Sequence, residues 1–253
     1  MIVCKSPAEI EKMRAASMLV ADVLEEIAAM VAPGVSTLEL DAAAERLVRD
    51  AGAQPAFKGY RGYPNTICAS VNEQVIHGIP SKQPLAVGDI ISLDMGVKMN
   101  GFFGDSAVTV PVGEIPEQAA ELLRVTRESL EKGIEQVRLG GRVSDIGHAI
   151  QAHVEAHGFS VVREFVGHGI GASLHEDPQI ANYGEPGRGP RLAEGMTLAI
   201  EPMVNVGKPG VKMLADGWTA VTRDGSLSAH FEHTVAVTKT GPLVLTRAAS
   251  RVR

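Results

Sequence analysis

The sequence has little cysteine, few aromatic residues and no concentrated positive charge, and these shortages exclude several classes of protein. Cys4 and Cys68 are its only cysteines, too few for the disulfide framework of a small secreted domain or for a paired-cysteine zinc site. Aromatic residues make up 4% of the chain, and 24 Lys and Arg against 30 Asp and Glu give a formal charge of -6. Because no basic block could follow a phosphate backbone, nucleic acid is not an expected partner.

Long apolar runs are missing as well. The first residues reach Lys5, Glu9 and Glu11 before the apolar region of a signal peptide can form, and no later stretch approaches the length of a membrane span. The 253 residues are 45% hydrophobic and 21% charged, which is typical of a globular protein with a sizeable core. These features predict a cytoplasmic protein with no membrane partner.

Helical periodicity is present in two stretches of similar layout. Residues 6–9 (Ser-Pro-Ala-Glu) form a capping box, and the apolar spacing after it predicts a helix that closes near residues 33–34. Ser36 and Glu39 begin a shorter helix that ends near Gly52, and further helices are predicted over residues 117–139 and 143–157. The recurring order predicts two pseudo-repeats, over approximately residues 6–112 and 116–240, within one α+β domain that spans residues 1–253.

Two hairpins are predicted, one in each half. Asn100-Gly101 is the dipeptide most favoured in a two-residue turn, and it lies between two apolar runs that contain Asp94 and Asp105. With this turn Asp94 faces Ala107, and Asp105 lies diagonally across on the same face of the sheet, near enough for both carboxylates to share metal ions. In the second half, Asp224-Gly225 predicts a turn that pairs residues 218–221 with residues 231–235.

Five potential metal ligands lie in apolar or glycine-rich runs, where a lone charge is costly to bury: Asp94, Asp105, His168, Glu201 and Glu232. Any one of them, taken alone, is more simply interpreted as a solvent-facing strand residue or a structural carboxylate than as a metal ligand. Four carboxylates that meet between two halves would repel one another unless cations neutralise them. Ligation by oxygen with a single imidazole suits a pair of divalent ions such as Mn, Fe, Co or Zn.

The remaining histidines fall into three groups. His77 and His175 stand in turn-like segments, where an imidazole beside a metal pair can donate a hydrogen bond to a substrate carbonyl. Three others have the spacing of an exposed helix face: His148, His153 and His157. His230 and His233 flank Glu232 and stay undecided, although strand alternation turns His233 away from the face of Glu232. Cys68 is interpreted as a small pocket or core residue rather than a nucleophile.

The order of the five ligands, in the segments SLDMGV, FFGDSA, VGHGIG, IEPM and HFEHT, together with LHEDPQI, resembles the methionine aminopeptidase family in its type I bacterial form. The resemblance covers nearly the whole chain. It implies the pita-bread fold, with two pseudo-symmetric halves around a dinuclear metal site, and removal of the initiator methionine ahead of a small second residue. By this resemblance Asp94 chelates one metal, Asp105 and Glu232 bridge both, and His168 with Glu201 complete the other.

The resemblance also implies catalytic and substrate-binding roles. The nucleophile would be a hydroxide that bridges the two metals, with Glu201 as the proton acceptor, His175 on the carbonyl oxygen and His77 on the scissile amide. The methionine pocket would be lined by Tyr60, Tyr63, Cys68, His77, His175 and Trp218. Phe57 and Leu174 depart from the residues common in the family and leave the pocket shape open. Asn72 and Ser228 match positions near a monovalent cation site.

Two other functions compete with this one. A proline-specific aminopeptidase or dipeptidase shares the fold, but those relatives carry a substantial N-terminal domain. A metal-free pita-bread module that binds peptides without cleaving them is the alternative from a different class, and such proteins lose the ligands that are present here. The expected partners are the N-termini of nascent polypeptides, with transient ribosome association and a monomeric state.

Overall fold

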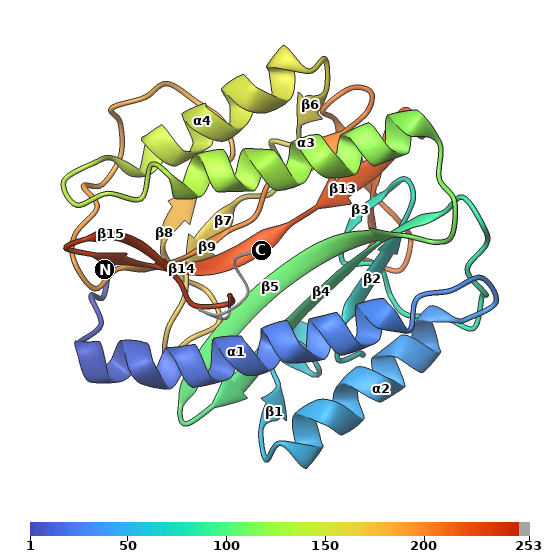
Figure 1. Ribbon diagram of the computed structural model, residues 1–253, viewed down its shortest axis with the longest axis horizontal. Helices are drawn as coiled ribbons and strands as arrows, with labels where there is room; N and C mark the ends of the chain where they lie inside the picture. Colours follow the sequence, from blue (N-terminus) through green and yellow to red (C-terminus); the bar gives the residue numbers. More distant parts are fainter. Residues whose placement is uncertain (248–253) are drawn as a thin grey trace.

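A large curled sheet dominates the computed structural model, which describes residues 1–247. Its strands follow the order β1-β4-β5-β14-β9-β7-β8, with β2 beside β4 and β15 beside β14. Their bounds are Gln54–Pro55 (β1), Cys68–Val71 (β2), Ile90–Met99 (β4), Phe102–Pro111 (β5), Gly167–Gly169 (β7), Glu176–Ile180 (β8), Thr197–Ile200 (β9), Glu232–Thr238 (β14) and Gly241–Val244 (β15). The central strand β14 therefore joins β5 from the first half of the chain to β9 from the second (Figure 1).

Two small sheets of three strands complete the β structure of the described residues. One has the order β13-β10-β6 and the other β11-β12-β3. Their bounds are Gln74–Ile76 (β3), Ser160–Val161 (β6), Met203–Asn205 (β10), Val211–Met213 (β11), Ala220–Thr222 (β12) and Ser228–His230 (β13). A 3₁₀ turn, η1, covers Tyr60–Gly62.

Four α-helices cover one face of the large sheet as two pairs (Figure 1): α1 (Pro7–Ala29) with α2 (Thr37–Asp50), and α3 (Glu117–Ile134) with α4 (Val143–Ala156). The predicted capping boxes are present, since the Ser6 hydroxyl accepts from Glu9 N–H and the Ser36 hydroxyl accepts from Glu39 N–H. None of the helices within residues 1–247 combines the length and the apolarity that crossing a membrane requires.

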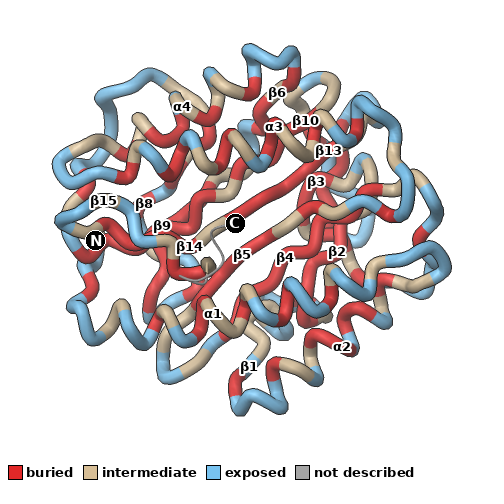
Figure 2. Tube along the Cα trace, in the orientation of Figure 1, coloured by how far each residue is buried: buried red, intermediate tan, exposed pale blue. Residues whose placement is uncertain are grey.

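The hydrophobic core lies between these helices and the sheet, as the buried strands behind exposed helix faces show in Figure 2. One cluster packs α1 and α2 on β4 and β5, and a second packs α3 and α4 on β9, β10 and β14. Gly104 on β5 faces α1 so closely that an added Cβ would lie 2.6 Å from the backbone nitrogen of Ser17. Strand alternation then turns its neighbour Asp105 to the opposite face of the sheet.

The β4–β5 hairpin has the predicted register. Asp94 pairs with Ala107 and Gly96 with Asp105, so the two carboxylates lie diagonally on one face. Asn100 and Gly101 have φ angles of 52° and 83°, the left-handed backbone that a type I′ turn requires. The turn type and the facing residues predicted from the sequence are confirmed.

Three element predictions are wrong. The first helix ends at Ala29 rather than near residues 33–34, which form a turn. The third helix ends at Ile134 rather than near residue 139, because residues 135–141 form turns in place of a further helical stretch. Residues 218–221 do not pair with residues 231–235. Instead β12 pairs with β3 and β11, while β14 pairs with β5 and β9. The Asp224 carboxylate accepts from Ser226 N–H and makes a local turn, but the strand after this turn enters a different sheet.

Candidate metal centre and substrate pocket

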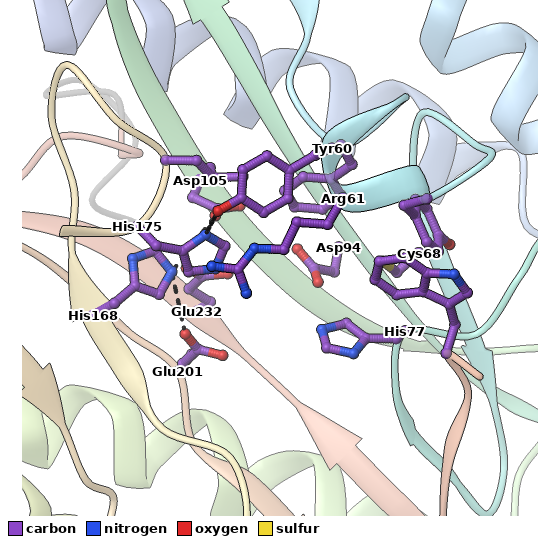
Figure 3. A pocket seen from close by; sticks show the side chains of 14 residues that line it. Tyr60, Arg61, Cys68, His77, Asp94, Asp105, His168, His175, Glu201 and Glu232 are labelled. Atoms are coloured by element: carbon purple, nitrogen blue, oxygen red, sulfur yellow. Dashed lines mark hydrogen bonds and ion pairs between the residues drawn. The ribbon is translucent and has the colours of Figure 1, made fainter. Parts of the chain in front are cut away.

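The five predicted ligand side chains meet at the floor of one pocket (Figure 3). Asp94 and Asp105 come from β4 and β5, His168 from β7, and Glu232 from the first residue of β14. Glu201 follows the last residue of β9. Strands distant in sequence therefore deliver these groups to one place.

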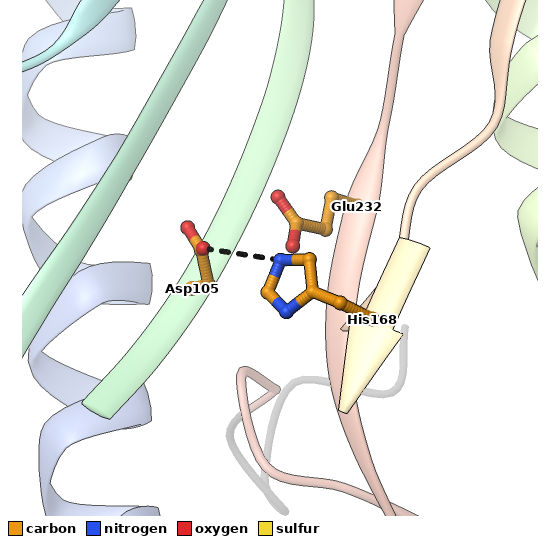
Figure 4. A group of neighbouring side chains, drawn as sticks. All are labelled: Asp105, His168 and Glu232. Atoms are coloured by element: carbon orange, nitrogen blue, oxygen red, sulfur yellow. Dashed lines mark ion pairs between the residues drawn. The ribbon is translucent and has the colours of Figure 1, made fainter. Parts of the chain in front are cut away.

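Three of these residues form the tightest group. Asp105, His168 and Glu232 are buried, and each offers one potential ligand atom within 4.8 Å of the other two (Figure 4). His168 Nε2 lies 3.9 Å from Asp105 Oδ2 and 3.6 Å from Glu201 Oε1. These separations are too long for hydrogen bonds and leave room for a shared cation.

Buried oxygen atoms at this floor have no hydrogen-bond partner among the described residues. They are Asp94 Oδ1, Asp105 Oδ1 and Glu232 Oε1. Burial raises the pKa of Asp94 to about 7, and burial with neighbouring carboxylates raises the pKa of the Asp105, Glu201 and Glu232 carboxyls. Such a cluster is costly without positive charge, so the donor set fits divalent cations.

The orientation of His168 fits the same interpretation. Its Nδ1 lies 2.9 Å from the carbonyl oxygen of Gly169, which can only accept a hydrogen bond, so the ring proton lies on Nδ1. The Nε2 lone pair then points to Asp105 and Glu201. Burial lowers the pKa of His168 to about 4, which keeps the ring neutral and able to ligate a metal.

His77 and His175 line the same pocket on either side of this floor. His175 Nδ1 lies 2.9 Å from the Tyr60 hydroxyl, and the two rings stack with centroids 5.3 Å apart. His77 has a φ of 61°, an uncommon backbone conformation for a non-glycine residue, and packs edge-on against Phe165 and Trp218. Burial lowers the pKa of His77 to about 4, so its imidazole is neutral.

The walls of the pocket are mostly apolar and enclose a cavity of about 150 Å³. Every residue predicted to bind substrate lies on it: Tyr60, Tyr63, Cys68, His77, His175 and Trp218. Phe57 and Leu174, the two departures from the family pattern, line it too. Burial and the nearby Asp94 carboxylate raise the pKa of the Cys68 thiol, which opposes thiolate chemistry there.

Two residues at this site, Arg61 and Asn182, were not predicted from the sequence. Arg61 lines the pocket with a φ of 50°, and its guanidinium lies 5.4 Å from the centroid of the Tyr60 ring. The two glycines that flank Tyr60-Arg61 are the available signal for such a tight turn. Asn182 is buried and donates a hydrogen bond to the backbone carbonyl of Glu201 at 3.0 Å. Nothing in its local sequence indicates this contact.

The undecided histidines differ in position. His230 is 1% exposed, and its Nε2 lies 3.7 Å from Glu201 Oε2. His233 points away from the pocket, with Nδ1 2.8 Å from the hydroxyl of Thr246 and Nε2 3.1 Å from an Arg247 nitrogen. His148 and His153 lie on α4, and His157 caps its C-terminal end; none of the three is among the residues that line the pocket. Asn72 and Ser228 are joined by a backbone hydrogen bond of 2.9 Å.

Comparison with known proteins gives matches over nearly the whole length. A family model described as metallopeptidase family M24 matches residues 11–239. Methionine aminopeptidase 1 of Bacillus subtilis is 57% identical over 247 residues, which cover 98% of this chain and 100% of the relative. A methionine aminopeptidase of Clostridium acetobutylicum is 53% identical, with coverage of 97% and 99%.

Solved structures agree with these matches. The crystal structure of methionine aminopeptidase from Thermotoga maritima superposes with a TM-score of 0.96 at 50% identity, covering 98% of this chain and 100% of that one. A prolidase from Pyrococcus horikoshii gives a TM-score of 0.79 at 22% identity, with coverage of 100% and 66%. The second likeness concerns the fold alone.

Proposed function

Because the chain belongs to metallopeptidase family M24 and, within it, to the methionine aminopeptidases, we propose that it removes the initiator methionine from newly made proteins. The observation that carries the proposal is the group of buried carboxylates and one imidazole at the floor of an apolar-walled pocket. This arrangement suits hydrolysis of a peptide bond beside a single apolar side chain.

The residues proposed to hold metal are Asp94, Asp105, His168, Glu201 and Glu232. Two divalent ions, of Co, Mn, Fe or Zn, suit this thiolate-free set, and a monovalent cation near Asn72 and Ser228 is a further proposal. When bound, the divalent ions would lower the pKa of a water molecule and polarise the scissile carbonyl.

The side chains around the floor have complementary tasks in this proposal. Tyr60 donates its hydroxyl proton to His175 Nδ1, so the Nε2–H of His175 can donate to the carbonyl oxygen as that oxygen gains charge. The neutral His77 positions the scissile amide from the opposite side. Glu201 accepts the proton of the attacking water and passes it to the leaving amine.

The pocket walls account for the preference for methionine. Tyr63, Cys68 and Trp218 are among the residues around a cavity of about 150 Å³, a space suited to one unbranched apolar side chain. Preference for a small second residue is part of the proposal and rests on the family. We further propose that the chain acts as a monomer in the cytoplasm on nascent polypeptides, with transient ribosome association.

The test is release of methionine from the peptide Met-Ala-Ser by metal-stripped protein, with and without added Co or Mn. Release is expected only with metal, and it is expected to fall by at least about a hundredfold in Glu201→Ala, which removes both a ligand and the proton acceptor. Met-Leu-Ser tests the second-residue preference, and Ala-Pro tests the prolidase alternative. Absence of release by folded protein with either metal, together with no bound metal by elemental analysis, would leave the metal-free peptide-binding module.

A further inference from the structure

Lys5 is a buried cation outside the pocket, on the segment that precedes α1. Its side chain is 4% exposed, and its Nζ lies 2.5 Å from Glu176 Oε2 and donates to the carbonyl oxygen of Val3 at 3.0 Å. The backbone N–H of Lys5 donates to the Gly195 carbonyl at 2.7 Å. Among the Lys and Arg ion pairs within residues 1–247, this one is the most enclosed.

Glu176 joins Lys5 to the loop that carries His175. This loop, residues 170–175, connects β7 to β8, and Glu176 follows His175 directly. Glu176 Oε2 faces Lys5, while Oε1 accepts the N–H of Ser173 at 3.0 Å. The carboxylate of Glu176 therefore links the middle of the loop to its end through Oε1, while Lys5 balances the charge at Oε2.

The loop also rests on the Lys5 side chain by direct contact. A Cβ added to Gly171 would lie 2.3 Å from Lys5 Cε and 2.7 Å from Nζ, so the loop backbone packs against the lysine with no space between them. The N–H of Phe103 donates to the Gly171 carbonyl at 2.9 Å and fixes the start of the loop. Removing the lysine would leave the partly buried carboxylate of Glu176 without its counter-ion beside this contact.

His175 has little freedom on the pocket side of the loop. Its ring stacks on Tyr60 and lies 4.3 Å, centroid to centroid, from the ring of His168. A shift of the loop backbone would therefore change where His175 presents its Nε2. Since a buried ion pair adds little net stability once its desolvation is counted, stability alone is a weak reason for this pair.

We propose that Lys5 is a positioning residue for His175: through Glu176 and its contact with Gly171 it holds the 170–175 loop in the position from which His175 acts. The proposal rests on the methionine aminopeptidase function proposed above. It adds a role for a lysine that touches neither the pocket nor the metal ligands.

A double-mutant cycle tests this role with metal-loaded protein and Met-Ala-Ser as substrate. Lys5→Met, which keeps the length of the side chain without its charge, is expected to lower kcat about tenfold with little change in KM, because small misplacements of catalytic groups are costly. Glu176→Gln, which keeps an acceptor for Ser173, is expected to act in the same direction. In the His175→Ala background, Lys5→Met is expected to cause no further loss.

Controls separate positioning from general damage. Lys239→Met removes a lysine from an exposed pair with Glu194 and is expected to leave kcat unchanged. Hydrogen exchange of the Gly171 and Ser173 amides, measured in metal-free protein, is expected to become about tenfold faster in Lys5→Met, while exchange in α3 stays the same.

Two results would overturn the proposal. One is a wild-type kcat in Lys5→Met, and the other is an equal loss of kcat with and without His175. An inactive wild-type enzyme would instead count against the proposed function. The hydrogen-exchange measurement would then test the positioning role without relying on activity. Unchanged exchange of the Gly171 and Ser173 amides in Lys5→Met would refute that role.

Discussion

The carboxylate of Glu201 lies between the imidazole rings of His168 and His230. These two neighbours set the surroundings of each of its oxygen atoms. Its Oε1 lies 3.6 Å from His168 Nε2, and its Oε2 lies 3.7 Å from His230 Nε2. His230 is buried, and neither of its ring nitrogens has a hydrogen-bond partner among the described residues. A small adjustment would let His230 donate to Oε2 and leave Oε1 to a metal, as groups behind metal ligands commonly do.

Replacing His230 therefore has a predictable effect on metal binding. We expect His230→Leu to weaken Mn binding about tenfold, because the outer oxygen of Glu201 loses its donor. His230→Gln keeps an N–H donor and is expected to retain most of the affinity, which isothermal titration calorimetry can measure. Equal affinities in the wild type and in His230→Leu would contradict this interpretation.

At the residue scale, the sequence could predict which side chains line the pocket but not every neighbour. The predicted ligands and the two pocket histidines line one pocket, and their unusual local settings made them identifiable in the sequence. The other predicted pocket residues, Tyr60, Tyr63, Cys68 and Trp218, line it too, but they were predicted from the family resemblance. Their individual roles stay predictions. Arg61, Asn182 and the Lys5–Glu176 pair come from contacts between segments distant in sequence, and no local pattern carries that information.

Among the elements, α2 depends on a cap that the sequence identified. The Ser36 backbone N–H donates to Glu39 Oε2 at 2.8 Å, and the Ser36 hydroxyl accepts from Glu39 N–H at 3.3 Å. We expect Ser36→Ala to lower the free energy of unfolding by about 1 kcal/mol, measured by urea denaturation. Ser36→Asp, another good N-cap, should unfold near the wild-type midpoint. A midpoint of Ser36→Ala equal to that of the wild type would show that the cap is dispensable.

The packing of α1 on β5 depends on a glycine. In Gly104→Ala the new methyl group would lie 2.6 Å and 2.7 Å from the backbone nitrogen and Cα of Ser17. The helix must move, and we expect a loss of about 1–3 kcal/mol in the free energy of unfolding.

A second substitution checks the cause of that loss. Adding Ser17→Gly removes only the hydroxymethyl group of the helix residue and leaves both backbone atoms in place. It should therefore not restore stability in urea unfolding. Recovery in the double variant would mean that the Ser17 side chain, rather than the helix backbone, limits the approach.

Elements with local signals were the easiest to predict. The four helix starts and the β4–β5 register follow from capping residues, apolar period and a two-residue turn. The strand partners of β12 and β14 were predicted wrongly, because pairing between distant strands depends on the whole sheet rather than on the turn at Asp224-Gly225. Non-local pairing leaves little trace in neighbouring residues.

For the molecule as a whole, the predicted α+β pita-bread fold is confirmed by the superposition on a solved methionine aminopeptidase. The division into two pseudo-repeats stays a prediction. Asp94 and Asp105 come from the part before α3, while His168, Glu201 and Glu232 come from the part after it. Metal bound by all five would link the two parts of the chain.

Metal removal should therefore lower global stability. A metal at about 1,000 times its dissociation constant would stabilise the folded protein by about 4 kcal/mol, so the metal-stripped protein should melt roughly 10 °C lower.

Glu232→Gln removes one crowded carboxylate. We expect it to melt above the wild type when both are metal-free and to gain little from added Mn, as differential scanning calorimetry can show. Glu194→Gln, at an exposed position, serves as the control, and a metal-independent melting temperature in the wild type would refute the link.

The central position of β14 has a consequence for synthesis on the ribosome. This strand begins at Glu232, yet it must insert between β5 and β9, which both precede it in the chain. Until β14 leaves the exit tunnel, β5 and β9 each have an unpaired edge, and the pocket lacks the carboxylate of Glu232. Folding of the sheet is thus delayed until nearly the whole chain is translated, and the growing chain depends on shielding from aggregation during that interval.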